Sequence, residues 1–398
     1  MGVRHKVFFI YHFFPHYRRA VFKAFCRCDK LDAVMLGAGD SAKIDPSIKA
    51  CSAMDFPDIQ VTRISRLGPF LWQHDMVGPL WRQSRGCSMV FLASPYFIST
   101  WVAATLLRLK GQQVLFWGHL RMPASDGFVR RYVTKFFYSL ANTLLPYGHT
   151  AKGELVRAGF DRAQIHVIYN SLDHVANTAL RGAAERADRK AILGRFFSDW
   201  QRPTLICVSR ILKKRRLDLA LDALRILKAR QMPVNLLLVG EGDEAAFLQA
   251  RAQSEGLAVG FFGACYDESE IAQLYGACDI TIAPGEVGLT AIQSLEFGVP
   301  VVTHGDHDHQ MPESESVIEG VTGRLFKRND AADLARVIYE MVAAGFDKCK
   351  WRRACYLVVD RFFTPQAQVN VIVRATAGLC ADDGDWNAVM NKLSGSEC

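Results

Sequence analysis

Apolar runs and amphipathic segments alternate along the second half of the chain. The short apolar runs lie at residues 203–210, 234–242, 258–265, 279–285 and 299–305. The segments with apolar residues at helical spacing lie at residues 217–230, 243–256, 268–278, 290–298 and 330–344. This alternation predicts strands and helices in turn, which is typical of a parallel sheet covered by helices on both faces. Such a doubly wound α/β domain binds ligands at the carboxyl ends of its strands.

The first half follows the same pattern with less regularity. Its apolar runs predict strands at residues 6–13, 31–38, 89–94 and 113–119. Its helical segments lie at residues 17–28 and 130–142. Two such halves predict two domains. The expected division is a first Rossmann-like domain at residues 1–178, a linker at 179–202, a second Rossmann-like domain at 203–355, and C-terminal helices at 356–398 that return to the first domain.

One stretch is long and apolar enough to resemble a membrane span. Residues 86–107 contain no charged side chain, and 22 residues suffice to cross a bilayer. Pro95 follows Ser94 in the middle of this stretch and separates a strand-like part from a helix-like part. Because proline disfavours a continuous helix through the residue before it, we expect a strand, a turn and a helix here.

The net charge of +8 is concentrated in the first half of the chain. Residues 1–150 contain 19 Lys and Arg against 8 Asp and Glu, whereas residues 151–398 contain 29 against 32. This asymmetry indicates that the first half meets an anionic partner, such as nucleic acid, phospholipid headgroups or a phosphate-bearing acceptor. Two predicted helices there mix cations with phenylalanine. These residues are Arg18, Arg19, Lys23, Arg27, Arg130, Arg131 and Lys135, with Phe14, Phe22, Phe25, Phe128, Phe136 and Phe137.

Cationic residues mixed with phenylalanine suit a membrane interface. An ordinary amphipathic helix, with phenylalanine in the core and arginine in solvent, explains the same pattern and stays open. The eleven cysteines form no CxxC pair, so a structural zinc site is not expected. Their odd number and the apolar neighbours of Cys207 and Cys278 favour reduced thiols in a cytoplasm. The first residues also lack the pattern of a signal peptide.

Six segments between Arg210 and Phe326 together resemble the retaining glycosyltransferases of family 4. They are "VSRILKKRRLDLALDAL", "LLLVGEGDEAAFL", "VGFFGACYDESEIAQLYGACDITIAP", "VGLTAIQSLEFGVPVVT", "MPE" and "VTGRLF". "VIYNSLD" at residues 167–173 resembles the element that ends the first domain of these enzymes. The resemblance implies the GT-B fold, with two doubly wound Rossmann-like domains facing across a cleft. It also implies a hexosyltransferase that moves a sugar from a nucleotide-diphosphate sugar to an acceptor with retention of configuration.

Two cations are expected to bind the diphosphate of the donor. Arg210 stands where the family has an Arg directly after a strand, and Arg215 stands where the family has a Lys. Cations at this place neutralise the charge that grows on the leaving group. Because an arginine fork needs a different geometry from an ammonium group, Lys214 is a reserve candidate.

The pair of glutamates typical of the family is altered in this chain. Alignment on Gly288 places Gly285 at the first Glu position and Gln293 at the second. Glu286 is displaced by one residue, and Glu296 lies one turn beyond Gln293, which aims it elsewhere. We expect Gln293 to hydrogen-bond the ribose and Glu286 to hold the transferred sugar, with an exposed loop carboxylate as the alternative for Glu286.

Further donor and acceptor contacts are expected from loops. Backbone N–H groups at Gly288, Leu289 and Thr290 open a helix, which suits a phosphate or sugar oxygen. Gly240 belongs to a two-glycine turn that lines the nucleotide pocket. Two aromatic side chains complete the candidate site: Tyr266, which would stack on the base, and His119, which would face the acceptor or be a structural histidine.

No metal or other cofactor is expected. The loop "THGDHDHQMPESE" gathers His304, His307 and His309 with Asp306 and Asp308. However, these residues alternate as in a loop, and no partner cluster of ligands is evident elsewhere in the sequence. The resemblance likewise implies no metal.

The expected partners are a nucleotide-sugar donor, a lipid-linked or saccharide acceptor and an anionic membrane surface, with no nucleic acid. By resemblance, the setting is polysaccharide assembly for the cell envelope by a cytoplasmic protein, peripheral on the inner face of the membrane. Two alternatives stay open because function depends on the site and not on the fold. They are a non-catalytic partner protein with the GT-B fold and a nucleotide-sugar epimerase.

Overall fold

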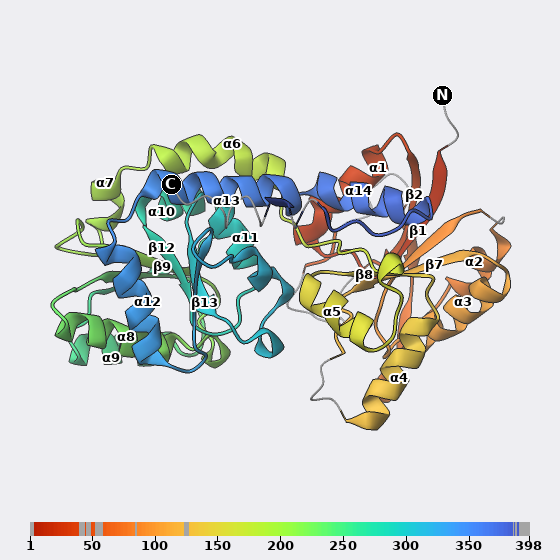
Figure 1. The fold of residues 1–398 in the computed structure, drawn as a ribbon, viewed down its shortest axis with the longest axis horizontal. Coiled ribbons are helices and arrows are strands. Elements are labelled where there is room, and N and C mark those ends of the chain that lie inside the picture. Colours follow the sequence, from red (N-terminus) through yellow and green to blue (C-terminus); the bar gives the residue numbers. More distant parts are fainter. Residues whose placement is uncertain are drawn as a thin grey trace. The chain divides into compact units, whose positions relative to one another are not determined.

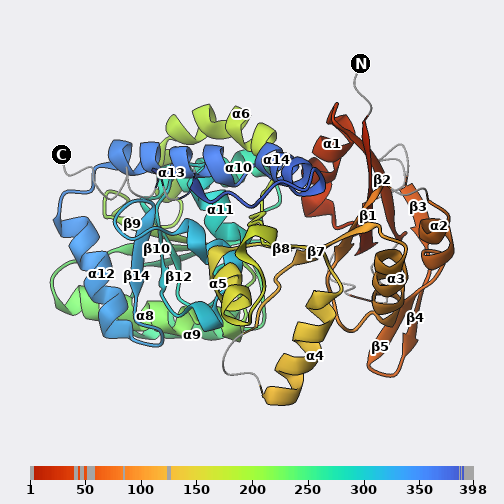
Figure 2. The same cartoon turned by 45° about the vertical axis from the view of Figure 1, so that its right-hand side comes forward.

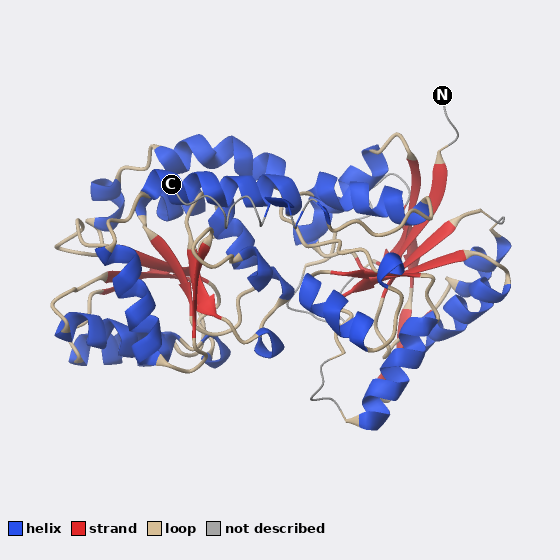
Figure 3. Ribbon diagram, in the orientation of Figure 1, coloured by secondary structure: helices blue, strands red, loops and turns tan. Residues whose placement is uncertain are grey.

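The computed structural model describes residues 4–39, 44, 49–51, 59–83, 86–122, 127–384, 386 and 388–389. The chain divides into two compact units. The first contains the described residues up to Asp173 together with those from Thr364 onward. The second contains His174–Phe363. Each unit has a six-stranded parallel sheet with helices packed on it (Figures 1 and 3).

The first sheet has the spatial order β3-β2-β1-β6-β7-β8. Its strands are β1 His5–Phe13, β2 Leu31–Ala38, β3 Ile59–Thr62, β6 Ser88–Leu92, β7 Gln113–Gly118 and β8 Thr143–Pro146. A separate antiparallel hairpin consists of β4 Ile64–Leu67 and β5 Phe70–Gln73. The helices of this unit are α1 Arg19–Arg27, α2 Val77–Arg82, α3 Ile98–Leu109, α4 Phe128–Ser139, α5 His149–Arg157 and α14 Pro365–Thr376.

The central strand β1 is apolar because both of its faces are buried. Phe9 stacks on Phe25 of α1 with ring centroids 4.4 Å apart, in a core that α14 also covers. Phe8 and Ile10 point to the opposite face and share a core with Leu107 of α3. Successive side chains of a strand face opposite sides, so burial on both sides requires a continuous apolar run.

The second sheet repeats this order as β11-β10-β9-β12-β13-β14. Its strands are β9 Thr204–Val208, β10 Asn235–Val239, β11 Val259–Gly263, β12 Ile280–Ala283, β13 Val301–His304 and β14 Gly323–Phe326. Leu236 and Leu238 share one core with α8 and α12, and Leu237 shares the other with α10. The helices of this unit are α6 His174–Glu185, α7 Arg189–Leu193, α8 Leu217–Ala229, α9 Ala245–Ser254, α10 Glu268–Ala277, α11 Leu289–Glu296, α12 Ala331–Ala343 and α13 Lys348–Phe362.

The strand order therefore reverses in the middle of each sheet, between β1 and β6 in the first and between β9 and β12 in the second. This is the doubly wound arrangement expected from the sequence, and the predicted fold class is confirmed. Ligands of such sheets bind beyond the carboxyl ends of the two strands at the change of direction. In the second unit, those ends lead into the loops that begin at Ser209 and Pro284.

The uncharged stretch at residues 86–107 forms β6, a turn and most of α3, as predicted. Within the described part of the chain, no helix is long and apolar enough to cross a membrane. The segment expected as a linker is instead occupied by most of α6 and by α7. Its side chains pack in the second unit, because Ala184 and Leu193 are buried against the α10 side of the sheet. The returning segment begins at Thr364 rather than at residue 356.

Candidate functional site

The loop after β9 carries the predicted diphosphate cations and is held by a glycine turn. Ile211 N donates to the backbone oxygen of Glu241 over 2.8 Å. A Cβ added at Gly240 would lie 2.0 Å from the backbone oxygen of Ser209, and one at Gly242 would lie 2.2 Å from that of Ile211. Both glycines also have positive φ, at +141° and +159°. The turn therefore places the basic loop by close backbone packing, which only glycine allows.

A second loop, between β12 and α11, lies against the basic loop. Gly285 N donates to the backbone oxygen of Arg215 over 3.0 Å, and Arg215 Nη1 donates to the backbone oxygen of Glu286 over 2.5 Å. A Cβ at Gly285 would lie 2.2 Å from the backbone oxygen of Lys214. A glutamate at position 285 would therefore push the two loops apart. The carboxylate of the next residue, Glu286, lies 3.9 Å from Lys214 Nζ.

These two loops enclose a hollow at the carboxyl ends of β9 and β12. Its polar wall is formed by Ser209, Arg215, Glu286, Gly288 and Thr290. Its apolar wall contains Cys207, Val208, Ile282, Ala283 and Val287. Burial raises the pKa of the Cys207 thiol, which keeps this group neutral. The charged side chains of the hollow are therefore one guanidinium and one carboxylate.

Arg215 lines the hollow, and one of its hydrogen-bond donors has no partner in the part of the chain that the structure describes. Its Nε atom is buried and has no partner among the described residues. A buried donor without a partner is costly, and native structures contain few of them. Helix α11 begins at the same place, and its N-cap residue, Gly288, has no side chain that could bind the first N–H groups of the helix. A guanidinium and a helix N-terminus that share one hollow suit an anionic ligand with several oxygens.

The predicted site residues are only partly brought together in the hollow. Arg215, Glu286, Gly288 and Thr290 line it, and Leu289 begins α11 directly behind them. Lys214 is exposed beside Glu286, and Arg210 is exposed two residues beyond β9. Gly240 does not line the hollow but packs against the backbone of the basic loop at Ser209. The fold thus gathers the predicted residues of the β12–α11 loop and one of the predicted arginines.

Three further predicted residues also lie outside the hollow. Gln293, one turn along α11, donates to Glu268 Oε2 over 3.3 Å and accepts from the Tyr275 hydroxyl over 3.5 Å, both from α10. Tyr266 follows β11 and is 91% exposed. His119 follows β7 in the first unit, where it is exposed. Its ring meets that of Tyr147 edge to face at 5.3 Å.

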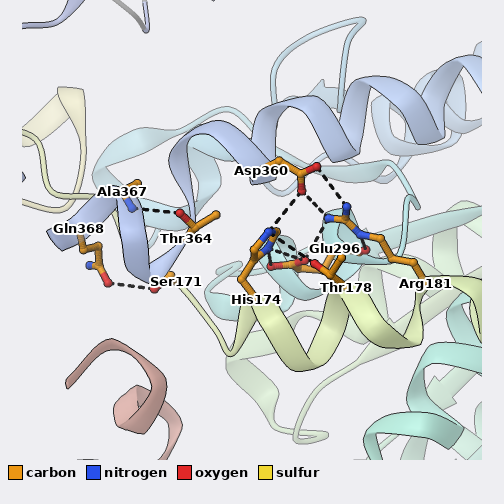
Figure 4. Close-up of polar contacts among 9 residues, drawn as sticks. All are labelled: Ser171, His174, Thr178, Arg181, Glu296, Asp360, Thr364, Ala367 and Gln368. Atoms are coloured by element: carbon orange, nitrogen blue, oxygen red, sulfur yellow. Dashed lines mark hydrogen bonds and ion pairs between the residues drawn. The ribbon is translucent and has the colours of Figure 1, made fainter. Parts of the chain in front are cut away.

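Glu296 is buried in a polar cluster that joins three helices of the second unit (Figure 4). Its Oε1 lies 2.9 Å from Nδ1 of His174, and its Oε2 lies 3.3 Å from Nη2 of Arg181, both on α6. Asp360 of α13 binds Arg181 over 2.6 Å. The guanidinium also lies over the ring of Tyr356 at 4.0 Å. The Glu296 carboxylate therefore contacts α6 and not the hollow, and α13 joins the cluster through Asp360.

Sequence reasoning missed Gln310, which places the β12–α11 loop. This residue is buried, and its Oε1 accepts from Val287 N over 2.8 Å. Its Nε2 donates to Thr303 Oγ1 over 2.8 Å and to the backbone oxygen of His304 over 3.1 Å. Gln310 lies in the His-rich segment, which was considered only as a source of histidine ligands for a metal. The one sequence signal for this role was the presence of a glutamine among the histidines.

The His-rich segment itself forms a hydrogen-bonded loop. His304 is buried, and burial, reinforced by Arg328, lowers its pKa to about 4. Asp306 contacts Nδ1 of His309 at 2.9 Å and Nη1 of Arg328 at 3.4 Å. Over the described residues, no group of three or more His, Cys, Asp or Glu side chains is placed to hold a metal ion. The expectation that the protein works without a metal stays a prediction.

The two sheets and the hollow at a change of strand order define the class of protein. It is an α/β protein of the GT-B type, with two Rossmann-like domains in one chain. Residues 188–354 match the model of the family Glycosyl transferases group 1. This match confirms, for that part of the chain, the resemblance carried by the six sequence segments.

Curated relatives match over parts of their length. A GDP-mannose-dependent α-(1-6)-phosphatidylinositol dimannoside mannosyltransferase of Mycobacterium tuberculosis is 33% identical over 109 residues, which are 26% of this chain and 28% of the relative. A glycogen synthase of Lactiplantibacillus plantarum is 29% identical over 143 residues, or 34% and 29% of the two chains. The chain therefore spans less than a third of the length of these relatives.

Solved structures match over nearly the whole chain. The crystal structure of Anabaena HepE in complex with UDP aligns with a TM-score of 0.68 at 17% identity, covering 94% of this chain and 100% of that one. At this identity, the likeness concerns the fold.

Proposed function

We propose that this protein is a glycosyltransferase that moves a sugar from a nucleotide-diphosphate sugar to an acceptor with retention of configuration. The observation that carries the proposal is the hollow itself, which is lined by Arg215 and by the first residues of α11. Such a site suits a diphosphate, because both groups stabilise negative charge without having to reorganise. The HepE structure, with its bound UDP, supports the same class of donor.

The residues of the hollow have distinct roles in this proposal. As the bond between the sugar C1 and the diphosphate oxygen breaks, charge grows on the diphosphate, and Arg215 stabilises it with help from Arg210. Glu286 accepts hydrogen bonds from hydroxyls of the transferred sugar. Lys214, whose Nζ lies 3.9 Å from the Glu286 carboxylate, is the reserve contact for the phosphate. The amides of residues 288–290 bind the remaining oxygens.

Three outlying residues complete the proposed contacts. Gln293 reaches the ribose from α11, Tyr266 stacks on the base, and His119 of the first unit orients the acceptor hydroxyl. In this proposal, the arginines supply the neutralisation that a divalent cation would provide elsewhere, so no metal is required. The proposed acceptor is a lipid-linked or surface-polysaccharide precursor at the cytoplasmic face of the membrane. The excess of basic residues at positions 1–150 supports an acceptor of this kind.

Ligand-induced stabilisation tests the donor directly. UDP, UDP-glucose, GDP-mannose and ADP-glucose are added in turn, and the cognate compound should raise the melting temperature because it binds only the folded state. Arg215→Ala should remove this rise, whereas Arg225→Ala, an exposed arginine on α8, should leave it unchanged. Stabilisation by none of the four compounds would favour the non-catalytic alternative.

The reaction itself is followed by proton NMR of the sugar released or transferred from the stabilising donor. Retention predicts that the first anomer to appear has the configuration of the donor. Release of the opposite anomer would contradict the retaining mechanism. Conversion of the donor into its epimer without acceptor would instead identify the epimerase alternative.

A further inference from the structure

The structure separates the two basic helices that the sequence offered as membrane-facing. In α1, the side chains of Phe22 and Phe25 are buried in the core beneath α14. Phe14, just before this helix, is buried in the same core. For α1, the ordinary amphipathic helix is therefore the correct interpretation. In α4, Phe137 is buried, but Phe128 and Phe136 are exposed.

One side of α4 is a continuous exposed apolar face. The exposed fractions are 83% for Phe128, 73% for Val129, 67% for Tyr132, 44% for Val133 and 56% for Phe136. Positions four residues apart lie on the same side of a helix, so these five residues form one stripe, which we call the α4 face. The helix projects from the first unit in both views (Figures 1 and 2). Soluble proteins rarely expose such a stripe without a use for it.

The α4 face continues onto neighbouring parts of the first unit. The ring of Trp101 lies 6.0 Å from that of Phe136, and its Nε1 donates to the backbone oxygen of Pro95 over 3.0 Å. Next to Pro95, Tyr96 is exposed and accepts at its backbone oxygen from Leu71 N of the β4–β5 hairpin. Tyr96 follows the carboxyl end of β6, so this surface begins at the edge of the sheet where ligands are expected.

The part of the chain that carries this surface is rich in cationic residues. Between Asp75 and Glu154, the sequence contains nine Lys and Arg residues and a single acidic residue, Asp126. Within α4, Arg131 and Lys135 border the exposed stripe on one side, by helical position, and Arg130 borders it on the other. No Asp or Glu occurs in this helix. An exposed apolar stripe flanked by cations on both sides is complementary to an anionic lipid surface.

We propose that the α4 face, continued by Tyr96, is the docking surface of this protein for a bilayer that contains anionic phospholipid. The aromatic side chains lie at the boundary between headgroups and acyl chains, and Arg130, Arg131 and Lys135 contact the lipid phosphates. This inference goes beyond the transfer reaction and does not depend on the donor chemistry. Docking through the α4 face turns the carboxyl edge of the first sheet toward the membrane, where a lipid-linked acceptor would be presented.

Co-sedimentation with vesicles tests the proposal on the full chain. The wild type should pellet with mixed phosphatidylcholine and phosphatidylglycerol vesicles at low salt, and not with phosphatidylcholine alone. The triple variant Phe128→Ser, Tyr132→Ser, Phe136→Ser should lose at least about tenfold in partitioning, because the aromatic anchors are gone. A matched control replaces three exposed apolar residues of the second unit, Val175→Ser, Phe247→Ser and Leu357→Ser, and should bind like the wild type.

Charge is tested separately from apolar contact. The double variant Arg130→Gln, Lys135→Gln should lose about fivefold in partitioning for each removed charge. Added salt should release the wild type, because the attraction is screened. Unchanged melting temperatures, together with unchanged stabilisation by the donor, would show that each variant is folded. Loss of vesicle binding with donor binding retained separates this proposal from the proposed function.

Two results would overturn the docking proposal. The first is vesicle binding by the triple variant at the level of the wild type. The second is a wild type that ignores vesicles but is a dimer by light scattering, while the triple variant is a monomer. In the second case, the α4 face would be an interface with a second copy of the chain.

Discussion

Among single residues, Arg215 is the one on which the proposed diphosphate site depends most. Its Nη1 donates to the backbone oxygen of Glu286, which fixes the position of the side chain in the wall of the hollow. We predict that Arg215→Ala lowers turnover by about two orders of magnitude with little change in melting temperature. Arg210→Ala, at an exposed position, should act in the same direction. Full activity in both variants would contradict the diphosphate clamp.

Gln293 must exchange its contacts with Glu268 and Tyr275 of α10 for a contact with the ribose if it binds the donor. Gln293→Ala should weaken donor binding about fivefold or more, since a ribose hydroxyl would lose its partner. Gln293→Glu would place a carboxylate beside Glu268, which now accepts from the Gln293 amide. We therefore expect this variant to bind donor poorly and the added change Glu268→Gln to restore binding. Calorimetric titration with the cognate donor measures all three proteins. Wild-type affinity in Gln293→Ala would remove this residue from the site.

At the scale of elements, loops and helices are held by polar groups that the sequence does not single out. Gln310 ties the β12–α11 loop to β13, and the Gly285 backbone lies directly on the basic loop. Glycine at position 285 is therefore a consequence of loop packing. The altered glutamate motif follows from it, because only Glu286 remains free to present a carboxylate in this loop.

The Glu296 cluster makes a separate prediction about helices. Its carboxylate is fully buried and joins α11 to His174 and Arg181 of α6. Removing one partner of a buried ion pair typically costs about 3–5 kcal/mol, and Asp360 should retain part of the Arg181 interaction. We expect Glu296→Ala to lower the melting temperature clearly while the folded protein keeps its donor affinity. Loss of donor affinity without loss of stability would assign this glutamate to the site instead.

For the whole molecule, three buried histidines couple stability to pH. Burial lowers the pKa of His12 to about 3 and those of His166 and His304 to about 4, with Lys152 adding to the effect at His166 and Arg328 at His304. Each folded-state pKa lies below the ordinary value of 6.5, so the unfolded chain binds protons that the folded chain does not. This contribution to stability is present above about pH 6.5 and is lost as the pH falls toward 4.

We predict that unfolding becomes easier by about 1–2 kcal/mol for each of these histidines between pH 7.5 and pH 5. Thermal melting at the two pH values measures the loss. His12→Gln removes one titrating group and should reduce the difference by about a third. Equal stability of the wild type at both pH values would contradict the prediction.

Sequence patterns alone predicted four strands of the first sheet, five of the second and most of the helices, but not β3, β8 or β14. Apolar runs such as residues 234–242 are short and lie next to Pro and Gly residues, which favours strands buried on both faces over helices. The β4–β5 hairpin escaped this reasoning, since its strands have four residues each and expose Leu67 and Phe70. The expected linker escaped it as well, because whether α6 and α7 pack against a core depends on residues far away in the chain.

The candidate site was also predicted from the sequence only in part. The order of motifs along the chain placed Arg215 and the β12–α11 loop at neighbouring strand ends, because adjacent parallel strands bring their loops together. Only the tertiary structure showed that Gln293 is engaged with α10 and that Gln310 supports the loop. The tertiary structure also distinguishes two helices of similar composition, because it buries the phenylalanines of α1 and exposes Phe128 and Phe136 of α4. Periodicity records which side of a helix is apolar, whereas packing alone decides what covers that side.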